Sequence, residues 1–307
     1  MDLKTSKPAS LLLAGLAILV CLTPIQSNAS GRMVAAFDDW TLADVGFFYP
    51  NEPGTFATNV AAWFTGGKPG KFLAWSTHPG YTGMGLSNAM TSAGHTWIVD
   101  HTASFTLTNL LTYDGVFVGG DAADTNVLIQ YVDAGGNVYV FSGGTAANPL
   151  WNGLVTHFGL EFTGGTAGGT IYPIVSTNVL FNGVDHLYGL NGPSDGAAVL
   201  DLDPNDPRNA VVASYQGAGL YAVWDGLIPV MNIRVSATSG NMATQVEVGW
   251  TSRSNRVYQL QSAASLSTAN PWTNMGLPIT AQSTNTSVLD AILPAQSEKY
   301  YRVYLQQ

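Results

Sequence analysis

Charged side chains are scarce in this chain of 307 residues. Only 10% of the residues are Asp, Glu, Lys or Arg, whereas 46% are hydrophobic. A disordered chain has the opposite balance, because high charge and few apolar side chains prevent it from burying a core. The 11 Lys and Arg residues are outnumbered by 20 Asp and Glu, giving a formal net charge of −9. The composition therefore excludes a disordered protein and a basic nucleic-acid-binding protein.

Long apolar runs are also lacking, apart from a short one near the N-terminus. Residues 11–22 are apolar or small, Lys4 and Lys7 precede them, and Ser27-Asn28-Ala29 follows with the small-x-small pattern of a signal-peptidase site. The run is shorter than the ~20 residues that a membrane-spanning helix needs. We therefore expect residues 1–29 to be a signal peptide. The mature protein is then periplasmic, at the cell surface or secreted, with no membrane span.

The single cysteine, Cys21, lies inside this run. It follows Val20 rather than a small residue, which argues against lipoprotein processing. Removal of the signal peptide leaves a chain without cysteine. Disulfides, a thiolate nucleophile and cysteine-based zinc sites are thereby excluded.

Two patterns follow one another along the mature chain. Over residues 30–226, short apolar runs alternate with helical periodicity, which is typical of β-α-β units and a mostly parallel sheet. Over residues 227–307, short alternating strands predict a small all-β sandwich. The expected strands of the first domain are 33–37, 71–76, 96–100, 115–118, 138–141, 198–202, 211–215 and 220–224. The expected helices begin at Pro53, at Gly85, after Asp121 or Asp124, and near Leu150.

Residues 33–38 (MVAAFD) are similar to residues 220–225 (LYAVWD). The likeness suggests that the first strand and helix form a rearranged or permuted edge of the sheet. Chance similarity of six apolar-rich residues explains it equally well.

The segments LTYDGVFVGG and VLIQYVDAGGNVYVFSGG, followed by STNVLFNGVDHLYGL, resemble the class I glutamine amidotransferase-like superfamily, especially its ThuA-like branch. The resemblance implies a flavodoxin-like three-layer α/β sandwich. It also implies a functional residue at the sharp turn after the strand at 138–141. Amidotransferases place a cysteine there and ThuA-like relatives a histidine, whereas Ser142 stands at this position here. The resemblance thus implies the fold without amidotransferase chemistry, that is, a pseudoenzyme.

The C-terminal segments VEVGWTSRSNRVYQLQSAASLSTANPWTNMG and KYYRVYL resemble fibronectin-III-like modules of secreted bacterial proteins. Such modules imply a spacer or a binding accessory.

Ser142 is the one candidate nucleophile. Gly143 and Gly144 follow it, so a strained turn can expose its hydroxyl, and His157 or His186 with Asp185 can supply a base and its orienting group. A serine before two glycines is common in ordinary turns, and a structural turn is the favoured interpretation. A serine hydrolase using Ser142 and His186 is therefore the alternative to a non-catalytic protein.

Four residues follow predicted strands and are candidates for a ligand cleft: His78, Gly119, Asp121 and Ser142. Open α/β sheets bind ligands at the carboxyl ends of their strands. A second candidate is the aromatic stretch Trp40, Phe47, Phe48 and Tyr49 beside Asp38, Asp39 and Asp44, which is suited either to sugar binding or to packing under a loop.

Three further patterns resemble ligand sites only in part. Residues 201–206 carry acids at calcium-loop spacing, but Asp206 replaces the required glycine, so a solvated turn is favoured. The glycine-rich residues 163–170 have no following Lys, which favours a flexible loop over a phosphate site. His95 and His101 lie too far apart on one strand to share a metal. We expect neither a metal nor a cofactor.

These observations favour a secreted, non-catalytic binding or surface-associated protein, with a glycan or cell-envelope component as its partner. The alternatives are the serine hydrolase and a structural spacer in an extracellular assembly. The oligomeric state is not indicated by the sequence.

Overall fold

The computed structural model describes residues 31–48, 52–143, 148–163, 170–190, 198–237, 244–252, 256–266, 272–283, 285–292 and 299–306. The predicted signal peptide, Tyr49, Gly144 and most of the glycine-rich segment lie outside these ranges.

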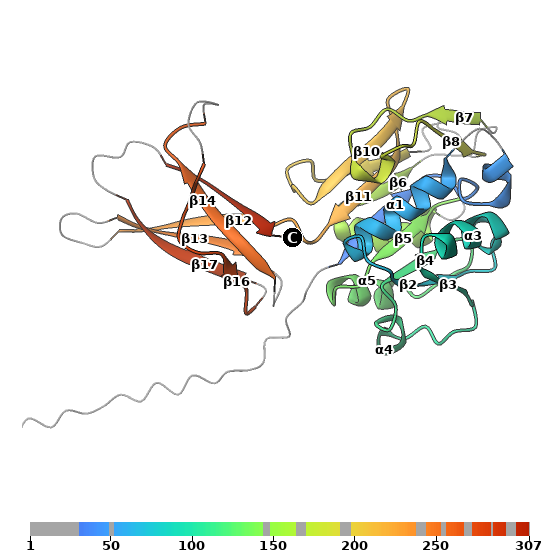
Figure 1. Ribbon diagram of the computed structural model, residues 1–307, viewed down its shortest axis with the longest axis horizontal. Helices are drawn as coiled ribbons and strands as arrows, with labels where there is room; N and C mark the ends of the chain where they lie inside the picture. Colours follow the sequence, from blue (N-terminus) through green and yellow to red (C-terminus); the bar gives the residue numbers. More distant parts are fainter. Residues whose placement is uncertain are drawn as a thin grey trace, which may run out of the picture.

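A seven-stranded mixed sheet forms the centre of the N-terminal part (Figure 1), with the strand order β10-β11-β1-β5-β4-β2-β3. Strands β1, β5, β4, β2 and β3 run parallel, whereas β11 is antiparallel to both of its neighbours. The bounds are β1 Arg32–Ala36, β2 Lys71–Trp75, β3 Thr96–Val99, β4 Gly115–Val118, β5 Val138–Phe141, β10 Asn209–Tyr215 and β11 Ala218–Asp225. The predicted α/β class is therefore correct.

The first strand is an interior strand. β1 pairs with β5 on one side and with β11 on the other, so that Met33 faces Val138 and Trp224. The expectation of a rearranged sheet edge is wrong for β1, because both of its backbone edges are paired. The two similar segments lie side by side as antiparallel neighbours.

The helices form two groups around this sheet. Helix α1 packs against α3, and α5 packs against α4 and α6. The bounds are α1 Pro53–Thr65, α2 Pro79–Thr82, α3 Met84–Ser92, α4 Leu107–Leu110, α5 Thr125–Asp133 and α6 Asn148–Val155, with short 3-10 turns η1 Asp44–Phe48, η2 Thr156–Phe158 and η3 Val179–Phe181. The helix expected after Asp121 or Asp124 is capped by Asp124, which accepts from the Asn126 and Val127 N–H groups.

Two small sheets stand outside the main one. β6 (Leu160–Thr163) pairs with β9 (Ala198–Asp201), and β7 (Thr170–Pro173) pairs with β8 (His186–Gly189), both antiparallel. The strand expected at 198–202 is therefore present, but it belongs to a two-stranded sheet rather than to the main one.

The C-terminal part consists of antiparallel sheets, drawn in Figure 1 as a body apart from the seven-stranded sheet. One contains β12-β13-β17, and the other is built on β14 with β15, β16 and β18. Val246, Val248 and Trp250 are buried on one face of β13, which is the alternation expected of the strands in residues 227–307. The bounds are β12 Met231–Ala237, β13 Thr244–Thr251, β14 Val257–Ala263, β15 Thr273–Asn274, β16 Ile279–Thr280, β17 Asn285–Ile292 and β18 Tyr300–Gln306.

Each part has its own hydrophobic core, and no residue is shared between the two buried clusters. Among the described residues, none of the helices has the length and apolar character needed to cross a bilayer.

Candidate functional site

The carboxyl ends of β1, β2, β4 and β5 bring the four predicted cleft residues together. His78 follows β2, Gly119 and Asp121 follow β4, and Ser142 follows β5. Parallel neighbouring strands end at the same edge of a sheet, which is why residues far apart in the chain meet here.

Close approaches of the backbone show how tightly this edge is built. A Cβ on Gly120 would lie 2.5 Å from His78 Cβ, and one on Gly119 would lie 2.5 Å from the Phe141 ring. A Cβ on Gly143 would lie 3.1 Å from the Asp39 carboxylate. Gly120 and Gly143 also have positive φ angles, of 79° and 69°, that disfavour other residues. The turns after β4 and β5 therefore need glycine at these positions.

The His78 imidazole is held at both of its nitrogens. The Gly80 N–H donates to Nδ1 at 3.0 Å, so Nδ1 is an acceptor and the ring proton resides on Nε2. Nε2 lies 3.3 Å from Asp39 Oδ2, and both side chains are largely buried. A serine–histidine–carboxylate triad needs one nitrogen facing the carboxylate and the other facing the serine. In His78 that second nitrogen instead caps the short helix α2.

Asp121 is the acceptor that joins the ends of β2 and β4. Its carboxylate receives the Thr77 N–H, the Thr77 hydroxyl at 2.8 Å and the Ser76 hydroxyl at 3.1 Å. Burial raises the pKa of Asp121, but these hydrogen bonds lower it by more, so its pKa lies below the usual value. The group is therefore a carboxylate at neutral pH.

The two acids after β1 differ in role. Asp38 is buried and accepts from the Trp40 N–H at 2.8 Å and from the Leu190 N–H at 2.8 Å, which ties the end of β8 to β1. Asp39 faces His78. Trp40 is half-buried, with its ring centroid 5.8 Å from that of His78.

The predicted hydrolase pair is not hydrogen-bonded. Ser142 is buried, and its N–H donates to the Ala36 carbonyl at 3.1 Å. His186 begins β8, where its N–H donates to Glu52 at 3.0 Å and its carbonyl accepts from the Glu52 N–H. Within the described residues, none of the hydrogen bonds of His186 goes to Ser142. Gly189, three residues further along β8, is the part of that strand that approaches Asp38.

The remaining candidate histidines, His157, His95 and His101, each contact side chains or backbone of their own surroundings rather than one another. His157 lies 3.9 Å from Asp133 rather than beside Asp185. His95 Nδ1 accepts from the Gly70 N–H, and the His101 ring lies beside Trp75.

In the aromatic stretch, Asp44 accepts from the Gly85 N–H at the start of α3, while Phe48 is 83% exposed. In the 201–206 turn, Asp206 is bonded to Arg208, and the Asp203 N–H donates to Asp201.

Sequence reasoning missed the Asp39–His78 contact and a polar pocket at the opposite edge of the sheet, described below. Asp39 after β1 and His78 after β2 were both recognised as candidates, but predicting their contact requires knowledge of the strand order. The pocket combines residues from 133 to 224 and has no local motif.

Among the described residues, no three His, Cys, Asp or Glu side chains are grouped closely enough to hold a metal ion. Comparisons with protein-family models, with curated proteins and with solved structures give no match. The function has to be argued from the geometry of this chain.

Proposed function

We propose that this chain is a secreted, non-catalytic binding protein that holds a hydroxyl-rich ligand of carbohydrate type at the carboxyl ends of β1, β2, β4 and β5. The observation that carries the proposal is the occupation of both His78 nitrogens, by the Gly80 N–H and by Asp39. Without a free acceptor nitrogen, this imidazole is not available as the general base for Ser142.

The groups at this edge suit hydroxyl recognition. Asp39 and Asp121 are acceptors fixed by their neighbours, Thr77 adds an exposed hydroxyl, and the Trp40 ring supplies an apolar face. Carboxylates and an aromatic face together bind the polar rim and the apolar face of a sugar ring.

The flavodoxin-like, amidotransferase-like ancestry is part of the same proposal. It rests on the quoted segments around β4, α5 and β5 and on the parallel order of β1, β5, β4, β2 and β3. Export rests on the N-terminal sequence pattern. The antiparallel C-terminal sheets serve as the accessory module.

Pull-down of mature protein by insoluble glycans and isolated cell envelopes, followed by calorimetry with soluble oligosaccharides, tests the binding. We expect Trp40→Ala to weaken binding about tenfold or more. The matched control is Phe48→Ala, an exposed aromatic of the same stretch, which should bind as the wild type does. The absence of any glycan or envelope binding would contradict the proposal and would favour the alternative of a structural spacer.

The hydrolase is tested on the same protein. Ester, amide and glycosidic substrates should be left intact by the wild type. Hydrolysis that Ser142→Ala abolishes would overturn the non-catalytic assignment.

A further inference from the structure

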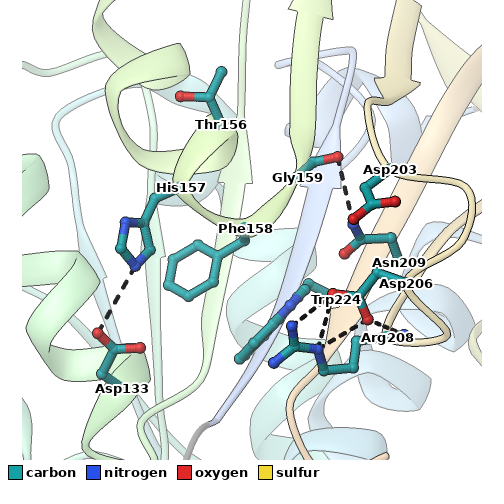
Figure 2. A pocket seen from close by; sticks show the side chains of 10 residues that line it. All are labelled: Asp133, Thr156, His157, Phe158, Gly159, Asp203, Asp206, Arg208, Asn209 and Trp224. Atoms are coloured by element: carbon teal, nitrogen blue, oxygen red, sulfur yellow. Dashed lines mark hydrogen bonds and ion pairs between the residues drawn. The ribbon is translucent and has the colours of Figure 1, made fainter. Parts of the chain in front are cut away.

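A polar pocket lies at the opposite edge of the main sheet, near the amino ends of β1 and β5. Trp224 of β11 faces Met33, and Met33 faces Val138, so this edge is where the parallel strands begin. The pocket has a volume of about 420 Å³, which is within the range of small-ligand sites. Figure 2 shows Asp133 and His157 on one side of it and Asn209, Asp206 and Arg208 on the other, with Phe158 and Trp224 between them.

Asn209 at the start of β10 has an unused acceptor in this pocket. The residue is only 8% exposed, and its Nδ2 reaches the Gly159 carbonyl at 3.5 Å. Its buried Oδ1 has no hydrogen-bond partner within the described part of the chain. A buried acceptor left unpaired is costly, and a ligand that donates a hydrogen bond removes that cost.

The charges of the pocket favour a positively charged donor. Arg208 is committed to Asp206, with an Nη2 to Oδ2 distance of 2.6 Å, and its guanidinium lies 5.4 Å from the centre of the Trp224 ring. Asp133 and Asp203 are the remaining acids. The ion pair of Asp133 within the described residues is with His157, at 3.9 Å, and Asp203 is exposed. Two acids without a fixed cation disfavour phosphate and other anions.

We propose that this pocket binds a primary organic ammonium, of the kind carried by an amino sugar or by an aliphatic diamine. An ammonium group has three donors and no acceptor, which suits the unpaired Asn209 oxygen and the Asp203 carboxylate on the same side of the pocket, while Asp133 adds negative charge on the other side. The proposal does not depend on the carboxyl-end site, because it uses a different edge of the sheet and different residues.

Calorimetry and thermal shift on the mature full chain test the proposal with three probes. Glucosamine and putrescine represent the two sources, and N-acetylglucosamine is the neutral counterpart of the first. We expect glucosamine or putrescine to bind and raise the melting temperature, and N-acetylglucosamine to bind at least tenfold more weakly. If glucosamine binds more tightly, the ligand is an amino sugar. If putrescine binds more tightly, it is an aliphatic diamine.

Two pocket variants and a charge-matched control locate the binding. Asn209→Leu and Asp203→Asn should each weaken ammonium binding at least tenfold, whereas Asp185→Asn, an exposed acid away from the pocket, should not. Asn209→Leu removes an acceptor without a partner together with the long Nδ2 contact to the Gly159 carbonyl, so the melting temperature of the ligand-free variant is measured alongside. If Asn209→Leu unfolds, Asp203→Asn provides the same test at an exposed position.

Failure to bind either ammonium, equal binding of N-acetylglucosamine, or unchanged binding in both Asn209→Leu and Asp203→Asn would overturn the proposal. Trp40→Ala separates this site from the proposed glycan site, because it should leave ammonium binding unchanged.

Discussion

At the scale of single residues, Asp121 is the acid that joins the ends of β2 and β4 at the carboxyl-end site. Its carboxylate accepts from the Thr77 N–H and from the hydroxyls of Thr77 and Ser76. Asp121→Asn replaces one acceptor oxygen with a donor, and we expect it to lower the free energy of unfolding at pH 7 by about 1–2 kcal/mol. Urea unfolding measures this loss.

The stability lost in Asp121→Asn should also depend on pH. Because the pKa of Asp121 is lower in the folded chain than its usual value of 3.8, its stabilisation is present above that value. It is lost as the pH falls from 3.8 through the folded pKa. The stabilities of the wild type and of Asp121→Asn should therefore converge in this acid range. A difference that stays constant from pH 7 into that range would contradict the assignment.

His95 is a base rather than an acid, so its effect on stability changes over a different pH range from that of Asp121. Burial lowers its pKa below 6.5, an effect that Asp114 partly opposes, and its Nδ1 accepts from the Gly70 N–H. The unfolded chain takes up the proton first as the pH falls below about 6.5, so the wild type loses stability there. In His95→Asn the amide oxygen can accept the same hydrogen bond without titrating.

We therefore expect His95→Asn to gain stability relative to the wild type between pH 7.5 and pH 5. Parallel urea titrations at the two pH values measure the difference. A relative loss at pH 5 would show that His95 is stabilised by its charge.

At the scale of elements, the cap of α5 is the clearest test. Asp124 accepts from the Asn126 N–H at 2.9 Å and from the Val127 N–H at 3.4 Å. Asp124→Ala should lower the free energy of unfolding by about 1 kcal/mol, whereas Asp124→Ser keeps a capping oxygen and should lose less. Equal losses in the two variants, measured by urea unfolding, would exclude the cap as the cause.

The element scale is also where sequence reasoning succeeded best. Pro53 at the start of α1, the residues of β4 and β5, and the alternation in β13 are local signals, and the structure has these elements where they were expected. The position of β1 between β5 and β11 was not predictable, because it depends on pairing between residues almost two hundred positions apart.

The candidate site was predictable only as a list of strand-end residues. His78, Gly119, Asp121 and Ser142 were recognisable because polar and glycine residues followed apolar runs. The contact of His78 with Asp39, and the use of its other nitrogen as a helix cap, depend on three-dimensional geometry. In the structure, His78 lies at the predicted strand end, with one nitrogen beside Asp39 and the other bonded to the Gly80 N–H.

At the scale of the whole molecule, the two separate cores predict two unfolding events. Leu260 is fully buried in the C-terminal core and Leu73 in the N-terminal core. Leu260→Ala should cost about 2–5 kcal/mol and lower only one of two calorimetric transitions, and Leu73→Ala should lower only the other. A single transition that both variants lower together would show that the two cores unfold as one unit.

The interior position of β1 has a consequence for how the chain matures. Strand β1 pairs with β11, so that Arg32 lies opposite Asp225, and an ion pair of 3.0 Å joins these two residues. Until residue 225 has been synthesised, one edge of β1 stays open, and open strand edges are aggregation-prone. The main sheet is therefore completed only once residue 225 is available, through pairing of high contact order. Until β11 is in place, the open edge of β1 favours pairing with other chains over the native pairing.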